Sequence, residues 1–182
     1  SKTSIIENKK MSNLTWFGVG GFSKYYFQPL SEKELISFLQ YNDLNLPIYP
    51  LGAGSNIIIR DKGFNGLIIH FNKLKEILID EEGIITAYSG AMDADVARFA
   101  RNHSREGLEF LIGIPGTIGG GIKMNSGAYG SEIKKILIDV TAINEKGMQK
   151  VFTVEDLKLD YRTNKLSQKW MFLKARFKSN SG

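Results

Sequence analysis

Apolar and polar residues alternate in short runs along most of the chain, and this period of two predicts strands more often than helices. Glycine, proline, asparagine or aspartate separate many of the runs, as expected for turns. The pattern therefore indicates an α+β fold with many strands. The predicted strands are residues 24–28, 47–51, 57–59, 67–71, 75–79, 84–88, 136–143, 149–154 and 170–177.

Helical spacing is confined to a few segments. Ser31 with Glu34 three residues later forms a capping-box pattern, and the helix that follows has one apolar face. Asp93 is the expected N-cap of a second helix over residues 94–105. Thr153 with Asp156 predicts a third, brief helix through residue 159, and residues 131–135 predict a helical turn. The apolar faces are formed by Leu35, Phe38 and Leu39, and by Val96, Phe99, Ala100 and His103.

The order of the elements predicts two lobes. Strand 24–28, the helix after Ser31 and strand 47–51 form a small βαβ lobe over residues 1–66, and residues 67–182 form a larger α+β lobe with a mixed sheet. Before the first strand, residues 9–21 are expected to be a loop. Its expected anchors against the body are Trp16, Phe17 and Val19.

Composition narrows the classes of function. The chain has 182 residues, 42% of them apolar, which is enough for a substantial core. It has no cysteine and only two histidines, which excludes thiolate sites and makes a metal site unexpected. No apolar run approaches 18 residues and residues 1–10 lack a signal-peptide core, so we expect no membrane segment and a cytoplasmic location. The net charge of +5 is scattered, and no motif indicates nucleic-acid binding.

Glycine is concentrated in one segment. Residues 107–130 contain 8 of the 19 glycines, including Gly119, Gly120 and Gly121 in a row. Glycines allow a ligand to approach the backbone closely, and consecutive N–H groups can point at one anion. The segment therefore favours a phosphate-type ligand. The alternative is a tight turn that packs against a helix.

A second glycine loop follows strand 47–51. Gly52 and Gly54 can present backbone N–H groups, and Ser55 and Asn56 add side-chain donors. The expected strand at 57–59 distinguishes this loop from the dinucleotide fingerprint, which requires a helix, and the NTPase loop requires Gly-Lys-Ser/Thr. A hairpin turn would look the same. Together with the 107–130 segment, the loop predicts a cradle for one anionic group.

Other candidate residues have structural alternatives. His70 lies on a strand and His103 near a helix end, where a hydrogen-bonded structural or capping role is expected for each. Tyr129 could stack beside a ring system or belong to the core. Arg162, next to Tyr161, has a planar donor fork suited to a carboxylate or phosphate, but without further context a surface arginine paired with a nearby acid is favoured.

Five phrases of the sequence resemble one family. In chain order they are T-W-F-G-V-G-G (15–21), L-G-A-G-S-N (51–56), G-I-P-G-T-I-G-G-G (113–121), M-N-S-G-A-Y-G (124–130) and Y-R (161–162). They are similar to the UDP-N-acetylenolpyruvoylglucosamine reductases, flavoenzymes of bacterial cell-wall precursor synthesis. The phrases span nearly the whole chain and are jointly specific, although G-x-G-S-N alone recurs among FAD-dependent oxidases.

The resemblance implies a two-lobed FAD-binding domain of the vanillyl-alcohol-oxidase (PCMH) type. It also implies NADPH as electron donor and a UDP-sugar substrate whose enolpyruvyl group is reduced by two successive hydride transfers. Tyr161 and Arg162 would bind this substrate, and Arg162 would act catalytically on its carboxylate; Thr163 and Asn164 stand where the family usually has a serine. The implied cofactor-binding residues are Leu51, Gly52, Ala53, Gly54, Ser55, Asn56, Ile114, Pro115, Gly116, Thr117, Gly119, Gly120, Gly121, Asn125, Gly127, Ala128, Tyr129 and Gly130.

In the family, the proton-donating serine and its assisting glutamate belong to a C-terminal substrate-binding domain. We find no counterpart of either residue, so we expect this domain to be absent and the fragment to be inactive on that substrate. Two other functions stay open. One is an FAD-dependent alcohol or sugar oxidase domain, and the other is a nucleotide-binding or interaction module whose glycine loops only shape its surface. The sequence does not indicate the oligomeric state.

Overall fold

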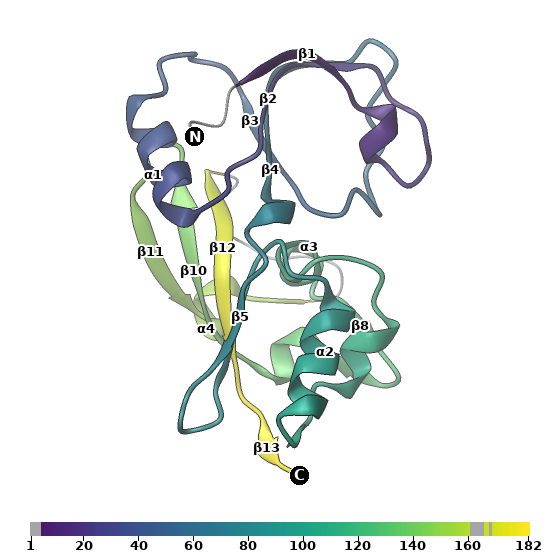
Figure 1. Ribbon diagram of the computed structural model, residues 1–182, viewed down its shortest axis with the longest axis vertical. Helices are drawn as coiled ribbons and strands as arrows, with labels where there is room; N and C mark the ends of the chain where they lie inside the picture. The colour runs from purple at the N-terminus through teal and green to yellow at the C-terminus, as the bar shows by residue number, and fades with distance from the viewer. Residues whose placement is uncertain (1–4, 161–165, 168) are drawn as a thin grey trace.

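A computed structural model describes residues 5–160, 166–167 and 169–182. It contains two main sheets, one above the other in Figure 1, with the helix α1 beside the upper sheet and the helices α2, α3 and α4 near the lower one. The structure confirms the α+β class expected from the many short apolar runs. Among the described residues, no helix has the length and apolar character needed to cross a membrane.

The upper sheet has four strands in the order β1-β2-β4-β3. β2 and β3 both pair in parallel with β4, which lies between them, while β1 pairs antiparallel with β2. Parallel strands need a crossover, and α1 (Glu32–Tyr41) provides it between β2 and β3. The strands are β1 (Ile6–Lys10), β2 (Phe22–Phe27), β3 (Ile48–Leu51) and β4 (Phe64–His70).

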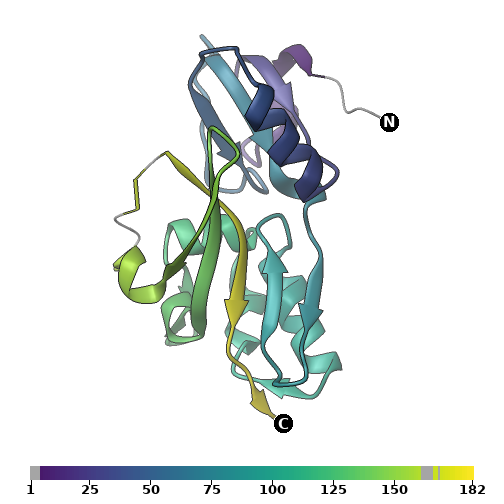
Figure 2. The same ribbon diagram turned by 90° about the vertical axis from the view of Figure 1, so that its left-hand side faces the viewer.

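The lower sheet is antiparallel throughout, in the order β11-β10-β12-β6-β5. Figure 2 shows its strands in front of the helices, which cover one face. The last long strand, β12, pairs with β10 on one side and with β6 on the other. The strands are β5 (Ile77–Ile79), β6 (Ile85–Tyr88), β10 (Leu137–Asn144), β11 (Gln149–Thr153) and β12 (Trp170–Phe177).

The remaining elements are short apart from one helix. Two small ribbons pair β7 with β13 and β8 with β9. The remaining helices are α2 (Asp93–Asn102), α3 (Ile118–Lys123) and α4 (Val154–Leu157). The 3-10 turns are η1 (Ser12–Leu14), η2 (Phe71–Lys73), η3 (Glu109–Gly113) and η4 (Ile133–Lys135). The strands of the two ribbons are β7 (Arg105–Glu106), β8 (Gly127–Ala128), β9 (Ser131–Glu132) and β13 (Asn180–Ser181).

The cap signals are largely as the sequence predicts. The Ser31 hydroxyl accepts a hydrogen bond from the Glu34 N–H at 3.2 Å, but the Glu34 carboxylate accepts from the N–H of Leu30 rather than from Ser31. Thr153 and Asp156 form a complete capping box at α4. These local bonds satisfy N–H groups that have no partner inside the helix.

The two sheets share part of their core. One buried cluster joins Phe27, Leu35 and Leu67 of the upper part to Met171 and Leu173 of β12. A cluster of polar side chains also joins the two sheets. In this cluster the Glu32 carboxylate of α1 accepts hydrogen bonds from Tyr88 Oη at 2.6 Å, Lys174 Nζ at 3.0 Å and Gln149 Nε2 at 2.8 Å. Helix α1, which lies beside the upper sheet, is therefore fixed to the lower sheet by both apolar and polar contacts.

Three expectations about the upper part were wrong or shifted. Trp16, Phe17 and Val19 are exposed, and the buried hydrophobic residue of this segment is Met11. Residues 9 and 10 belong to β1, so residues 9–21 are not all loop. Residues 57–59 form no strand; Ile57 and Ile59 pack on a small core cluster from irregular backbone. β4 runs through residues 66 and 67, so the expected lobe boundary at that point falls inside a strand.

Candidate functional site

The two glycine segments meet at one cavity of about 1120 Å³. The loop after β3 lines one part of it, and residues 113–117, 119–121 and 123–128 line another. Residues 170–172 at the start of β12 complete the lining from the lower sheet. The cavity therefore lies between the two sheets, where loops from both can contact one ligand.

The loop at residues 52–56 is held in place by its neighbours. His70, at the end of β4, contacts the Gly52 carbonyl through Nε2 at 3.0 Å and the Tyr26 hydroxyl through Nδ1 at 2.7 Å. A carbonyl only accepts, so Nε2 carries the hydrogen and the tyrosine hydroxyl donates to Nδ1. Burial lowers the pKa of His70 to about 4, so the ring is neutral at pH 7. This is the structural role expected for His70.

Gly54 is the position in this loop that most requires glycine. Its φ is +69°, and a Cβ there would collide with the carbonyl oxygen of Leu14. The Gly54 carbonyl in turn accepts a hydrogen bond from the Trp16 N–H at 3.0 Å. The loop is thus packed against the backbone of residues 14–16, and an added side chain would displace it.

The second glycine segment pairs with the chain that leads into α2. The Asp93 N–H donates to the Gly116 carbonyl at 3.0 Å, and the N–H groups of Ile118 and Gly119 donate to the carbonyls of Ala91 and Ser89, both at 2.9 Å. Residues 89–93 and 116–119 therefore run side by side in opposite directions. A Cβ on Gly119 would lie 2.9 Å from Ser89 Cβ, so the glycine permits this spacing.

Asn125 is held by protein contacts. Its side chain is buried, with Nδ2 donating to Glu132 Oε2 at 2.9 Å and Oδ1 accepting from the Lys134 N–H at 3.1 Å. Its φ is +42°, a left-handed conformation that asparagine tolerates better than most residues. Asn125 thus fixes the turn that carries residues 126–132 along the cavity.

Three polar side chains at the cavity are buried without hydrogen-bond partners. They are Ser89, Asp93 and Thr117, and the four atoms concerned are Ser89 Oγ, both Asp93 carboxyl oxygens and Thr117 Oγ1. Buried polar groups nearly always have partners, because leaving one unpaired costs about 1–3 kcal/mol. Burial raises the pKa of Asp93 to about 7.

The prediction that Asp93 is the N-cap of α2 was wrong. The N-cap is Met92, and Asp93 is the first residue of the helix, with its side chain buried in the protein.

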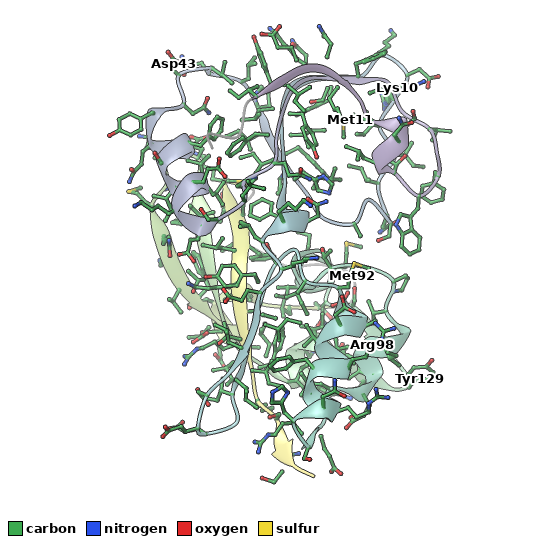
Figure 3. The ribbon with its side chains drawn as sticks, viewed as in Figure 1. Lys10, Met11, Asp43, Met92, Arg98 and Tyr129 are labelled. Carbon is green, nitrogen blue, oxygen red and sulfur yellow. The ribbon has the colours of Figure 1, made fainter. Side chains whose placement is uncertain are left out.

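Almost all of the predicted cofactor-binding residues line this cavity. The exception is Tyr129, whose side chain is 83% exposed and lies beside Gly113. Figure 3 shows Tyr129 at the outer edge of the lower part of the molecule. Tyr161 and Arg162 lie outside the described residues. The lining residues among those predicted are Leu51, Gly52, Ala53, Gly54, Ser55, Asn56, Ile114, Pro115, Gly116, Thr117, Gly119, Gly120, Gly121, Asn125, Gly127, Ala128 and Gly130.

The sequence did not single out Ser89 and Asp93 as site residues, nor the charged groups of the lining, Lys123, Glu132 and Lys135. Lys135 donates to the Gly130 carbonyl at 2.9 Å.

Within residues 5–160, 166–167 and 169–182, no group of three or more histidine, cysteine or acidic side chains could hold a metal ion. His103, the other histidine, is the C-cap of α2 and its Nδ1 lies 2.8 Å from the Phe99 carbonyl, as expected for a capping residue.

Replacing His70 with phenylalanine is expected to lower the free energy of unfolding by about 1–3 kcal/mol at pH 7, because the Gly52 carbonyl and the Tyr26 hydroxyl each lose a partner. The deficit should shrink as the pH falls from about 6.5 to 4. In that range the unfolded wild type binds a proton that the folded His70 does not, so the wild type itself loses stability. Urea unfolding at several pH values measures both effects. His103→Gln, on the surface, is the control; an equal loss in both variants would contradict the prediction.

The chain belongs to the FAD binding domain family, whose model matches residues 23–153. Over all of its length it is also similar to UDP-N-acetylenolpyruvoylglucosamine reductases. It is 44% identical over 185 residues to the protein of that name from Rickettsia massiliae (strain Mtu5), and 44% identical over 160 residues, 86% of this chain, to that from Orientia tsutsugamushi (strain Ikeda). It spans 61% and 53% of these relatives, and is thus similar to the FAD-binding part of such reductases.

Solved structures agree with this fold. The reductase (MurB) from Thermus caldophilus superposes with a TM-score of 0.80 at 25% identity, covering 98% of this chain and 62% of that chain. A cholesterol oxidase from B. sterolicum superposes with a TM-score of 0.72 at 12% identity, covering 98% of this chain and 38% of the oxidase. At that identity the likeness shows the fold alone. The α+β FAD-binding fold of the vanillyl-alcohol-oxidase type is thereby confirmed.

Proposed function

We propose that this chain binds FAD as the cofactor-binding part of a UDP-N-acetylenolpyruvoylglucosamine reductase, an FAD-dependent oxidoreductase of peptidoglycan precursor synthesis. The observation that carries the proposal is the meeting of the two glycine loops, some 60 residues apart in the sequence, at a single cavity. The reductase relatives favour this function over the oxidase alternative, because the oxidases resemble the chain in fold alone.

The residues at the cavity fit a dinucleotide cofactor. Glycine backbone at Gly52, at Gly54 and at residues 119–121 allows the close approach that a diphosphate needs, and Ser55 and Asn56 add neutral donors. Three further polar side chains are buried there without a protein partner, as expected where a ligand supplies the missing hydrogen bonds. When bound, FAD supplies hydride-transfer chemistry, and the protein contributes its position and electrostatic environment.

The finer details of the reaction are part of the proposal. NADPH is the electron donor, a UDP-sugar carrying an enolpyruvyl group is the substrate, and the cytoplasm is the location. Tyr161 and Arg162 bind the substrate, with the guanidinium of Arg162 holding its carboxylate and stabilising negative charge that develops during reduction. The two lobes expected from the sequence act together as one FAD-binding domain.

A titration with FAD tests the cofactor assignment. We expect the flavin fluorescence to change saturably when the purified chain is added, and denaturation of the complex to release intact FAD. A lack of saturable binding would contradict the proposal. For the full-length enzyme, NADPH consumption that depends on the enolpyruvyl substrate supports the reductase, whereas hydrogen peroxide formed from an alcohol or sugar supports the oxidase.

A further inference from the structure

Asp93 is the one ionisable side chain among the three unpartnered polar side chains at the cavity. Its side chain is fully buried, and neither carboxyl oxygen has a hydrogen-bond partner. An ionised carboxylate without any donor is among the least favourable groups to bury. The buried carboxyl group of Asp93 therefore needs either to be protonated or to receive a hydrogen bond from a ligand.

Two glycines of the cavity lining lie beside the Asp93 carboxyl group. A Cβ built on Gly116 would lie 3.4 Å from Asp93 Oδ2, and one built on Gly121 would lie 3.2 Å from Oδ1. Both glycines line the cavity together with Asp93. Because neither carries a side chain, only backbone atoms of Gly116 and Gly121 stand beside the carboxyl group at these two points.

The two other side chains without hydrogen-bond partners, Ser89 and Thr117, lie near the same glycine segment. Ser89 contacts Gly119, and the Thr117 hydroxyl lies where a Cβ on Gly52 would collide with it, between the two glycine loops. Ser89 and Thr117 hydroxyls are neutral and can donate, but an ionised carboxyl group can only accept. Beside an anionic diphosphate, Asp93 can contribute favourably only when it is protonated.

We propose, on the basis of the FAD-binding function above, that Asp93 is a further cofactor-binding residue that donates a hydrogen bond from its protonated carboxyl group to a diphosphate oxygen, with the Ser89 and Thr117 hydroxyls as neighbouring donors. Binding of FAD above neutral pH then takes up one proton from solvent. The burial that raises the pKa of Asp93 to about 7 supports the protonated form.

The proposal predicts how FAD affinity depends on pH. Above about pH 7, the affinity of the wild type should fall by up to about tenfold per pH unit, because the free protein must first gain a proton. Asp93→Asn keeps the shape and a permanent donor. It should bind FAD within about threefold of the wild type at pH 6 and show a flat profile to pH 9. Lys123, Glu132 and Lys135 also line the cavity, but they are unchanged in the variant, so the difference between the two profiles reports Asp93.

Asp93→Leu keeps the branching at Cγ and the number of side-chain heavy atoms but removes the hydrogen bond, and it should weaken FAD binding at pH 6 by tenfold or more. Asp95→Asn, on the exposed surface of the same helix, is the matched control and should follow the wild type. Equal pH profiles for wild type and Asp93→Asn, or wild-type affinity in Asp93→Leu, would overturn the proposal. If Asp93→Leu does not fold, the Asp93→Asn profile decides. Failure of the wild type to bind FAD would instead refute the proposed function.

Discussion

Replacing Asp93 with asparagine is expected to stabilise the folded chain, without FAD, by up to about 4 kcal/mol at pH 8 and to have little effect at pH 4. Burial on folding raises the pKa of Asp93 from 3.8 to about 7, and a tenfold change in proton affinity corresponds to about 1.4 kcal/mol. In the native state Asp93 keeps its proton as the pH rises from about 4 to 7, while the unfolded chain releases it. The wild type therefore loses stability across that window, and Asp93→Asn does not.

The measurement is the difference between the two urea-unfolding free energies at each pH. The wild-type curve alone would mislead, because the lowered pKa of His70 makes stability rise between about pH 4 and 6.5 and so opposes the effect of Asp93. Subtraction removes the His70 contribution, which both proteins share. Asp95→Asn, which loses an exposed ion pair with Arg98, should change stability by less than about 1 kcal/mol at every pH. A pH-independent difference for Asp93→Asn would show that Asp93 is not desolvated.

Replacing Gly54 with alanine is expected to lower the free energy of unfolding and to weaken FAD binding. The left-handed backbone conformation costs an alanine about 1–2 kcal/mol, and collision with the Leu14 carbonyl adds about 1–3 kcal/mol unless the loop moves. Because the same loop lines the cavity, its displacement should also weaken FAD binding by tenfold or more. Thermal unfolding and flavin fluorescence measure the two consequences.

Gly18→Ala is the matched control for this substitution. Gly18 has nearly the same φ, +65°, but no atom lies within 4 Å of an added Cβ, and it does not line the cavity. It should show only the backbone cost of about 1–2 kcal/mol and unchanged FAD affinity. If the two variants lose the same stability and the same affinity, the packing of Gly54 against Leu14 is unimportant.

Local signals in the sequence predicted much of the fold. The capping pairs at Ser31 and Thr153 placed the starts of α1 and α4. The glycine and proline clusters located both loops of the cavity, because proline restricts the backbone and glycine permits conformations that other residues avoid. The position of β4 between β2 and β3 could not be predicted in this way. It depends on pairing between residues far apart in the chain.

The errors share a physical cause, because burial depends on distant neighbours. Asp93 at the start of a helix looks like a cap, and only the fold shows that its carboxyl group faces glycine backbone instead of the first turn. Trp16 and Phe17 were expected to anchor their segment against the body, yet they are 61% and 57% exposed. Tyr129 lies within the glycine segment, but its left-handed φ of +51° belongs to a turn that directs the ring outward.

The central position of β12 has a consequence for folding during synthesis. β6 and β10 each pair with this strand, so both expose an unpaired edge until residues 170–177 have left the ribosome. Formation of the lower sheet must wait for residues 170–177, and the pairing of β6 with β12 closes a loop of more than 80 residues. A nascent chain at this stage is a natural client for chaperones that shield strand edges.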